Sequence, residues 1–129
     1  MILLDTNIIV ALFRSSELDH VRAKELIEPL EEFAISDYVL GEILTVLQLR
    51  ESKAIAEQAL DYLTSTKTVL LVRLSQDELE MSYDFFKKQG ENLSFTDVSL
   101  LILSRERDYS LATLDKDLIK AAKKHFGRH

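Results

Sequence analysis

The stretch Ile2-Leu3-Leu4-Asp5 opens the chain, and Leu111-Ala112-Thr113-Leu114-Asp115 lies near its other end. Both are short apolar runs of the kind that forms a buried β-strand, and both stop at an aspartate. If the two strands are parallel, their aspartates leave the sheet at the same edge, formed by the carboxyl ends of the strands. Either aspartate alone is equally well explained as a helix cap or a turn residue. The repetition is what suggests a shared site.

Short apolar runs alternate with longer amphipathic stretches along the chain. The runs predict strands, of which the second is the weakest, and the stretches carry apolar residues at helical spacing. The predicted strands span residues 2–4, 33–36, 69–72 and 110–114, and the first predicted helices span 19–31, 37–50 and 54–63. Strands and helices that alternate in this way need crossover connections. We therefore expect an α/β fold of three layers, with a short, mainly parallel central sheet flanked by helices.

The later helices are predicted from signals at their ends. Ser75 begins one with the spacing of a capping box, and Gly90 is well placed to end it. Ser94 or Thr96 can cap the next helix, which is apolar on nearly all sides and should be central and buried. A last amphipathic helix is predicted for residues 117–125.

Composition restricts the class of protein. With 129 residues and 47% hydrophobic content, we expect residues 1–129 to form a single domain. The absence of cysteine excludes disulfides, thiolate zinc sites and cysteine nucleophiles, and it fits a cytoplasmic protein. The N-terminus does not resemble a secretion signal, and no apolar stretch is long enough to span a membrane.

The formal net charge of −6 argues against simple electrostatic binding of nucleic acid, which needs clustered lysine and arginine. Divalent cations held by part of the acidic excess would weaken this objection, because the ions place positive charge beside the phosphate. Residues 120–129 are basic, but cations are also favoured in the last turn of a helix. His20, His125 and His129 have charged neighbours in the sequence and are interpreted as surface residues.

Two further acids occur at unusual positions. Glu42 falls on the predicted apolar face of its helix, beside Tyr38, Val39, Val46 and Leu49, which predicts a buried carboxylate. Asp97 lies in the first turn of the most apolar helix. Each has a simpler explanation, because Glu42 could reach water from the edge of that face and Asp97 could complement the helix dipole.

Four carboxylates at one edge of a sheet would repel one another unless they were protonated or bridged by metal. A set of oxygen ligands without cysteine or a nearby histidine suits Mg²⁺ or Mn²⁺ better than zinc. Such ions activate water and stabilise charge on the leaving oxygen in phosphoryl chemistry. The sequence therefore predicts a metal site formed by Asp5, Glu42, Asp97 and Asp115.

Over nearly its whole length the chain resembles the PIN-domain family, and within it the VapC-type toxin ribonucleases. The residues 5–7, Asp-Thr-Asn, resemble the opening motif of the family, and residues 113–117, Thr-Leu-Asp-Lys-Asp, resemble its closing Thr-x-Asp-x-Asp motif. Glu42 and Asp97 match the second and third acids. No single motif is specific, but their order and spacing together are.

The resemblance implies a PIN-like fold and a Mg²⁺- or Mn²⁺-dependent endoribonuclease that hydrolyses RNA phosphodiester bonds. Asp5 and Asp97 would be principal ligands, and Asp115 and Glu42 would complete the catalytic site. Residues expected to orient these acids are Thr6, Asn7, Thr113 and the accessory acid Asp117. The resemblance also implies the toxin of a type II toxin–antitoxin pair, with a cognate antitoxin and a homodimer as expected partners.

Other functions fit the sequence less well. A phosphatase of the haloacid-dehalogenase kind would have a second aspartate where Asn7 stands, and the chain lacks a glycine-rich nucleotide-binding loop. A housekeeping RNA-processing nuclease would have the same chemistry as a toxin in another genetic context. A catalytically idle module that binds RNA or protein would not need all four acids.

Overall fold

The computed structural model describes residues 1–65 and 68–127. In these residues a four-stranded sheet has the order β3-β2-β1-β4, and each neighbouring pair of strands is parallel. The strands are β1 (Ile2–Leu4), β2 (Phe33–Ser36), β3 (Val69–Val72) and β4 (Ser110–Ala112). All four lie where the sequence predicts them, although β4 is two residues shorter.

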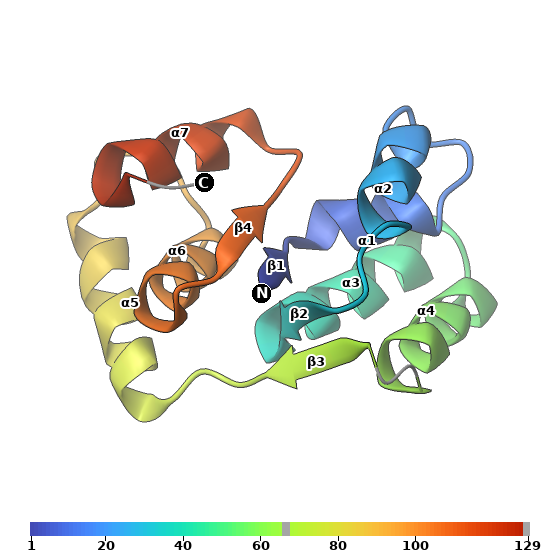
Figure 1. Cartoon of the computed structure of the whole chain (residues 1–129), viewed down its shortest axis with the longest axis horizontal. Coiled ribbons are helices and arrows are strands. Elements are labelled where there is room, and N and C mark those ends of the chain that lie inside the picture. The colour runs from blue at the N-terminus through green and yellow to red at the C-terminus, as the bar shows by residue number, and fades with distance from the viewer. Residues whose placement is uncertain (66–67, 128–129) are drawn as a thin grey trace.

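Helices cover both faces of this sheet. Figure 1 shows α1 to α4 on one side of the strands and α5 to α7 on the other. They are α1 (Thr6–Leu12), α2 (His20–Ile27), α3 (Asp37–Arg50), α4 (Lys53–Ser65), α5 (Gln76–Lys88), α6 (Phe95–Arg107) and α7 (Lys116–Phe126). The predicted three-layer α/β/α fold is confirmed. Among the described residues, no helix is long and apolar enough to cross a membrane.

The order in which the strands are added to the sheet reverses at β1. From β1 the chain advances through β2 to β3, and it then returns to form β4 on the other side of β1. In register, Leu4 of β1 faces Ala112 of β4, so both strands end together. Ligands of open α/β sheets bind at such a switch point, outside the carboxyl ends of the strands. The residues that follow β1 and β4 are Asp5 and Thr113.

Helix α6 is the buried centre of one helical layer, as the sequence predicts. Every residue from Val98 to Ser104 is buried, including two serines. The hydroxyl of Ser99 donates to the carbonyl oxygen of Thr96, and that of Ser104 donates to the carbonyl oxygen of Leu101. Because these hydroxyls bond to their own helix, an almost continuous apolar helix tolerates them.

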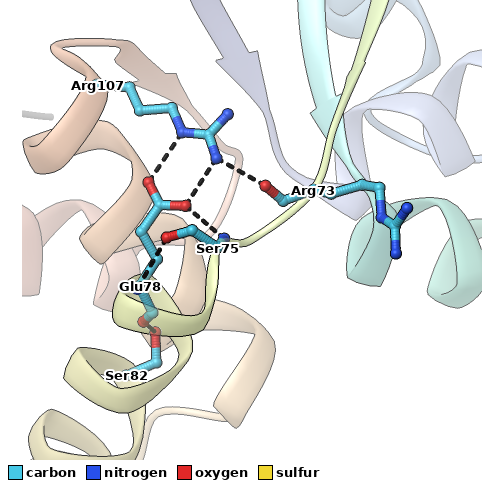
Figure 2. A network of polar contacts seen from close by, with 5 residues as sticks. All are labelled: Arg73, Ser75, Glu78, Ser82 and Arg107. Carbon is cyan, nitrogen blue, oxygen red and sulfur yellow. Dashed lines mark hydrogen bonds and ion pairs between the residues drawn. The ribbon is translucent and has the colours of Figure 1, made fainter.

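An ion pair joins the far end of α6 to the start of α5. Arg107 donates through Nε and Nη2 to the two carboxylate oxygens of Glu78, at 2.8 and 2.7 Å. Its Nη2 also donates to the carbonyl oxygen of Arg73, and the Ser75 amide donates to Glu78 Oε1. Figure 2 shows this network around the capping box that Ser75 and Glu78 form, as predicted. It fixes the turn between β3 and α5 against the end of α6.

Helix α2 and the end of α5 differ from the predictions. Helix α2 ends at Ile27 because Pro29 has no amide hydrogen to continue it, and its Val21 is 60% exposed despite the apolar pattern. Helix α5 ends at Lys88, before Gly90, and the loop is closed by the Gln89 side chain, which bonds to the backbone of Leu93.

Helix α3 spans the predicted residues 37–50, and the ends of α4 and α7 differ from the predictions by one or two residues. Helix α4 is slightly longer at both ends. Ser94 rather than Thr96 caps α6. Asp115 caps the start of α7, and Gly127, which follows its last residue, adopts the left-handed φ of +67° that favours glycine at a helix end. The outer elements therefore depend on local caps more than on apolar spacing.

Candidate active site

A cavity of about 410 Å³ opens where β1 and β4 end. Its lining includes the four acids that the sequence singles out, although they come from four separate parts of the chain. Six carboxylates and one guanidinium line it in all: Asp5, Glu17, Asp19, Glu42, Asp97, Asp115 and Arg50. The fold therefore brings the predicted acids to one place, while their catalytic role stays a prediction.

Asp5 lies at the base of the cavity and is only 5% exposed. Its Oδ1 accepts the Thr6 amide at 2.7 Å and caps α1, and its Oδ2 accepts the hydroxyl of Thr113 at 2.7 Å. Burial raises the pKa of Asp5 to about 6 despite these bonds, and repulsion from Asp97 and Glu42 contributes. A positive charge placed in the cavity would oppose both effects and favour the ionised carboxylate.

Thr113 and Asn7 hold the two strand ends together. The Thr113 hydroxyl donates to Asp5 and accepts from the Asp115 amide at 3.0 Å, so one oxygen links both acids. The Asn7 side chain donates to Thr113 Oγ1 at 3.2 Å and accepts from the Leu114 amide at 3.1 Å. Both residues therefore orient the acids, as expected. Helix α1 is capped by Asp5 itself.

Substitution of Thr113 by valine, which has the same shape, should loosen both acids. We expect RNA cleavage to fall by about 10–100-fold, the usual cost of losing a group that orients a metal ligand. The Mn²⁺ affinity, measured by calorimetry, should fall as well. Thr64→Val is the matched control, because the Thr64 hydroxyl bonds only to the Leu60 carbonyl on an exposed helix face. Equal activity of the two variants would contradict this role for Thr113.

Asp97 and Asp115 each cap a helix with one carboxylate oxygen. Asp97 Oδ2 accepts the Ser94 amide at 3.1 Å in a capping box, and Asp115 Oδ1 accepts the Asp117 amide at 2.9 Å. The second oxygen of each accepts no hydrogen bond within residues 1–65 and 68–127. Burial raises the pKa of Asp97, and repulsion from Asp115 and Glu42 adds to it. Each aspartate therefore serves as a cap and still offers one oxygen to a ligand.

Glu42 is not on the buried face of α3, so that prediction is wrong. The buried residues of this helix are Val39, Ile43 and Leu47, whereas Leu49 and Tyr38 are exposed. Glu42 is exposed at the mouth of the cavity and has no hydrogen bond in the described part of the chain. The error arose because Tyr38 and Leu49 were counted as part of the core face.

The accessory acid and the histidines do not reach the cavity. The Asp117 side chain is exposed and lines a different hollow, beside Lys120. His20 is half-buried rather than on the surface, with Nδ1 2.8 Å from the Ala11 carbonyl oxygen. His125 is exposed and pairs with Glu91. His129 lies outside the described residues.

Glu17 and Asp19 also line the cavity, although the sequence analysis did not predict them, and they differ from the four predicted acids because each forms an ion pair. Glu17 pairs with Arg14 at 2.9 Å, and Asp19 pairs with Arg22 at 3.2 Å. In contrast, none of the four predicted acids forms an ion pair with a basic side chain of residues 1–65 or 68–127. The cavity therefore contains a net negative charge that its own residues do not neutralise.

The donor set suits a hard divalent cation, which prefers oxygen ligands. Thr6 adds a buried hydroxyl that has no hydrogen-bond partner among the described residues. In that part of the chain, no three acidic or histidine side chains are already arranged to hold an ion. The free oxygens of Asp97 and Asp115 and the exposed Glu42 would therefore have to turn toward an ion that Asp5 holds at the base.

The family model of the PIN domain matches residues 2–124, nearly the whole chain. This chain belongs to the PIN-domain family. No protein of curated function matched the sequence. Family membership agrees with the resemblance seen in the order and spacing of the four acids.

Three solved structures with the same fold come from bacteria. Mycobacterium tuberculosis VapC20, described as a sarcin–ricin loop cleaving toxin, has a TM-score of 0.87 and 22% identity, with 94% of this chain and 95% of that chain covered. VapBC2 from Rickettsia felis, bound to a DNA fragment from its promoter, has a TM-score of 0.66, 20% identity and coverage of 93% and 92%. A toxin–antitoxin complex from Klebsiella pneumoniae has a TM-score of 0.66, 24% identity and coverage of 89% and 87%. At these identities the likeness establishes the PIN fold alone.

Proposed function

We propose that this PIN-domain protein is a Mg²⁺- or Mn²⁺-dependent endoribonuclease that hydrolyses RNA phosphodiester bonds, and that it is the toxin of a type II toxin–antitoxin pair. One observation carries the proposal. Four carboxylates without a cationic partner among the described residues line one cavity at the switch point of a parallel sheet. Acids that served only as helix caps would have no reason to converge there.

The residues of the cavity would have different roles in hydrolysis. Asp5 would hold the ion at the base, and Asp97 and Asp115 would each offer the oxygen that caps no helix. When bound, the ion supplies positive charge beside the phosphate and makes water a better nucleophile. Glu42, exposed at the mouth, is free to orient or deprotonate that water. Thr113 keeps Asp5 and Asp115 at a fixed separation while the substrate changes.

Asp5→Asn should separate metal binding from folding. The pKa of Asp5 in the fold, about 6, exceeds its ordinary value of 3.8, so stability of the metal-free protein falls as pH rises from about 4 to above 6. That difference corresponds to at most about 3 kcal/mol. The neutral asparagine removes this cost, but its amide nitrogen cannot accept the hydrogen bonds that Thr113 and Asn7 donate to Asp5 Oδ2. We therefore expect the variant to be about 1–2 kcal/mol more stable than wild type at pH 7.5 without metal.

Thermal unfolding in EDTA and in Mn²⁺ measures both effects. Mn²⁺ should raise the Tm of wild type, because an ion that binds only the folded protein stabilises it. The Tm of Asp5→Asn should stay nearly unchanged, because this variant lacks the ligand. Asp61→Asn, an exposed substitution on α4 outside the cavity, should respond to Mn²⁺ like wild type. A full Mn²⁺ response in Asp5→Asn would overturn the assignment of this ligand.

The solved structures that share this fold support the toxin role. One of the similar structures is described as a toxin–antitoxin complex, one as a sarcin–ricin loop cleaving toxin, and one as VapBC2 bound to a DNA fragment from its promoter. By analogy, we propose a small antitoxin as partner, a homodimer as the active assembly and the cytoplasm as its place of action.

Inducible expression in bacterial cells tests this role. Wild type should arrest growth within a few generations, and co-expression of the product of a small gene immediately upstream should relieve the arrest. Asp97→Asn should not arrest growth at an equal protein level. If wild type is tolerated but the purified protein cuts RNA, a housekeeping nuclease becomes the better account. If it neither arrests growth nor cuts RNA, an idle binding module does.

A further inference from the structure

We infer that Arg50 binds a phosphate of the RNA that flanks the bond to be cut. The inference rests on the proposed function, because it assumes that RNA enters the cavity. It assigns a positioning role to a residue that the motifs of the sequence do not include. Arg50 is the only basic residue among those that line the cavity in the described part of the chain.

The position of Arg50 follows from the geometry of α3. Glu42, Val46 and Arg50 are spaced by four residues, so they lie along one face of this helix, and all three line the cavity. Eight residues of helix span about 12 Å, which separates Arg50 from Glu42 by more than the size of a phosphate group. Arg50 therefore lines the cavity about 12 Å along α3 from Glu42.

Arg50 has no ion pair and no hydrogen bond within residues 1–65 and 68–127, although acids surround it. The adjacent Glu51 pairs with Arg14 at 3.1 Å, and Glu17 pairs with the same arginine. Asp19, on the same wall, is paired with Arg22. The nearby carboxylates are therefore already neutralised by other arginines. The guanidinium of Arg50 remains available to a ligand.

A phosphate is the ligand that best fits this end of the cavity. A guanidinium binds phosphate through parallel N–H donors and keeps its charge at any pH. A cation in the last turn of α3 also complements the helix dipole, but the dipole does not require the side chain to line the cavity. An acidic cavity repels an RNA backbone on either side of the metal, and Arg50 offsets that repulsion at one flank.

Binding of a fluorescein-labelled, unstructured 12-nucleotide RNA tests the inference. Fluorescence anisotropy is measured in Ca²⁺ at several salt concentrations, and a gel confirms that the RNA stays intact. For Arg50→Gln we expect Kd to rise by about 5–10-fold at low salt, and the slope of log Kd against log salt to fall by about 0.7, the contribution of one single-strand phosphate contact. Arg50→Lys should recover part of the affinity, because it restores the charge without the planar donors.

Arg105→Gln is the matched control. It removes the same charge from an exposed arginine near the far end of α6, eight residues beyond Asp97, and should leave Kd and the salt slope unchanged. Mn²⁺ should raise the Tm of Arg50→Gln as much as that of wild type, because Arg50 is not a metal ligand. Equal affinity of wild type and Arg50→Gln would overturn the inference and leave the proposed function intact. Absence of RNA binding by wild type would overturn both.

Discussion

RNA cleavage is expected to slow by more than about 100-fold when Asp97 is replaced by asparagine, because losing a ligand should cost more than losing a group that orients one. Asparagine still accepts the Ser94 amide through its carbonyl oxygen, so the capping box of α6 is largely kept. The change in helix dipole interaction should cost only about 0.3–1 kcal/mol. The loss should therefore appear in kcat and in Mn²⁺ affinity, while the Tm in EDTA changes little.

Asp77→Asn provides the control for this substitution. Asp77 lies in the first turn of α5, a helix that also begins with a capping box, and its exposed side chain does not line the cavity. Its substitution should leave kcat within about twofold of wild type, which corresponds to less than half a kcal/mol in the barrier. If Asp97→Asn cleaved RNA as fast as Asp77→Asn, the activity would come from a contaminant or from another site.

Arg107→Met should lower the free energy of unfolding by about 2–4 kcal/mol, near the cost of leaving a buried charge without its partner. The Glu78 side chain is 8% exposed and that of Arg107 is 29% exposed, so water screens the pair only on the arginine side. The substitution also removes the donor to the Arg73 carbonyl (Figure 2). Urea denaturation followed by circular dichroism measures the loss.

Two comparisons isolate the ion pair from the loss of packing. Arg105→Met, on the same helix, removes an exposed pair with Glu106 and should cost less than about 1 kcal/mol. The double variant Glu78→Gln, Arg107→Met leaves no buried charge and should be more stable than Arg107→Met alone. If the double variant were less stable than the single one, burial of the unpaired Glu78 carboxylate would not be the cause of the loss.

The same pair makes the wild-type protein sensitive to acid. The hydrogen bonds from Arg107 lower the pKa of Glu78 from 4.5 to about 2, so the stabilisation is complete above about pH 4.5 and is lost as pH falls toward 2. The difference corresponds to at most about 3 kcal/mol. The stability of Arg107→Met should therefore fall less steeply than that of wild type over this range.

Local signals in the sequence were enough to locate the strands and two of the acids. The apolar runs before Asp5 and Asp115 form β1 and β4, and the parallel pairing of these strands puts both aspartates at one edge. Helix α6 could be predicted as buried because its apolar residues leave no polar face. These features depend on neighbours in the sequence, and such neighbours determine strand direction and helix caps.

Features that depend on partners distant in the sequence were not predicted. The Glu78–Arg107 pair joins residues 29 positions apart, and nothing in either local sequence indicates it. Glu42 was placed on the wrong face because α3 leaves part of its apolar surface exposed, as at Leu49. Arg50 could have been found, because it continues the four-residue spacing from Glu42 through Val46. The ion pairs of Glu17 with Arg14 and of Asp19 with Arg22 each join residues three positions apart, so local spacing could have indicated them.

The central claim is that the four carboxylates bind a divalent cation that RNA cleavage requires. Its most direct test is cleavage of a labelled structured RNA by purified wild type in Mg²⁺, in Mn²⁺ and in EDTA, beside Asp5→Asn and Asp97→Asn. We predict cleavage by wild type with either metal, none in EDTA, recovery when metal is added back, and loss in both variants. Undiminished cleavage in EDTA, or cleavage by either variant at the rate of wild type, would contradict the account.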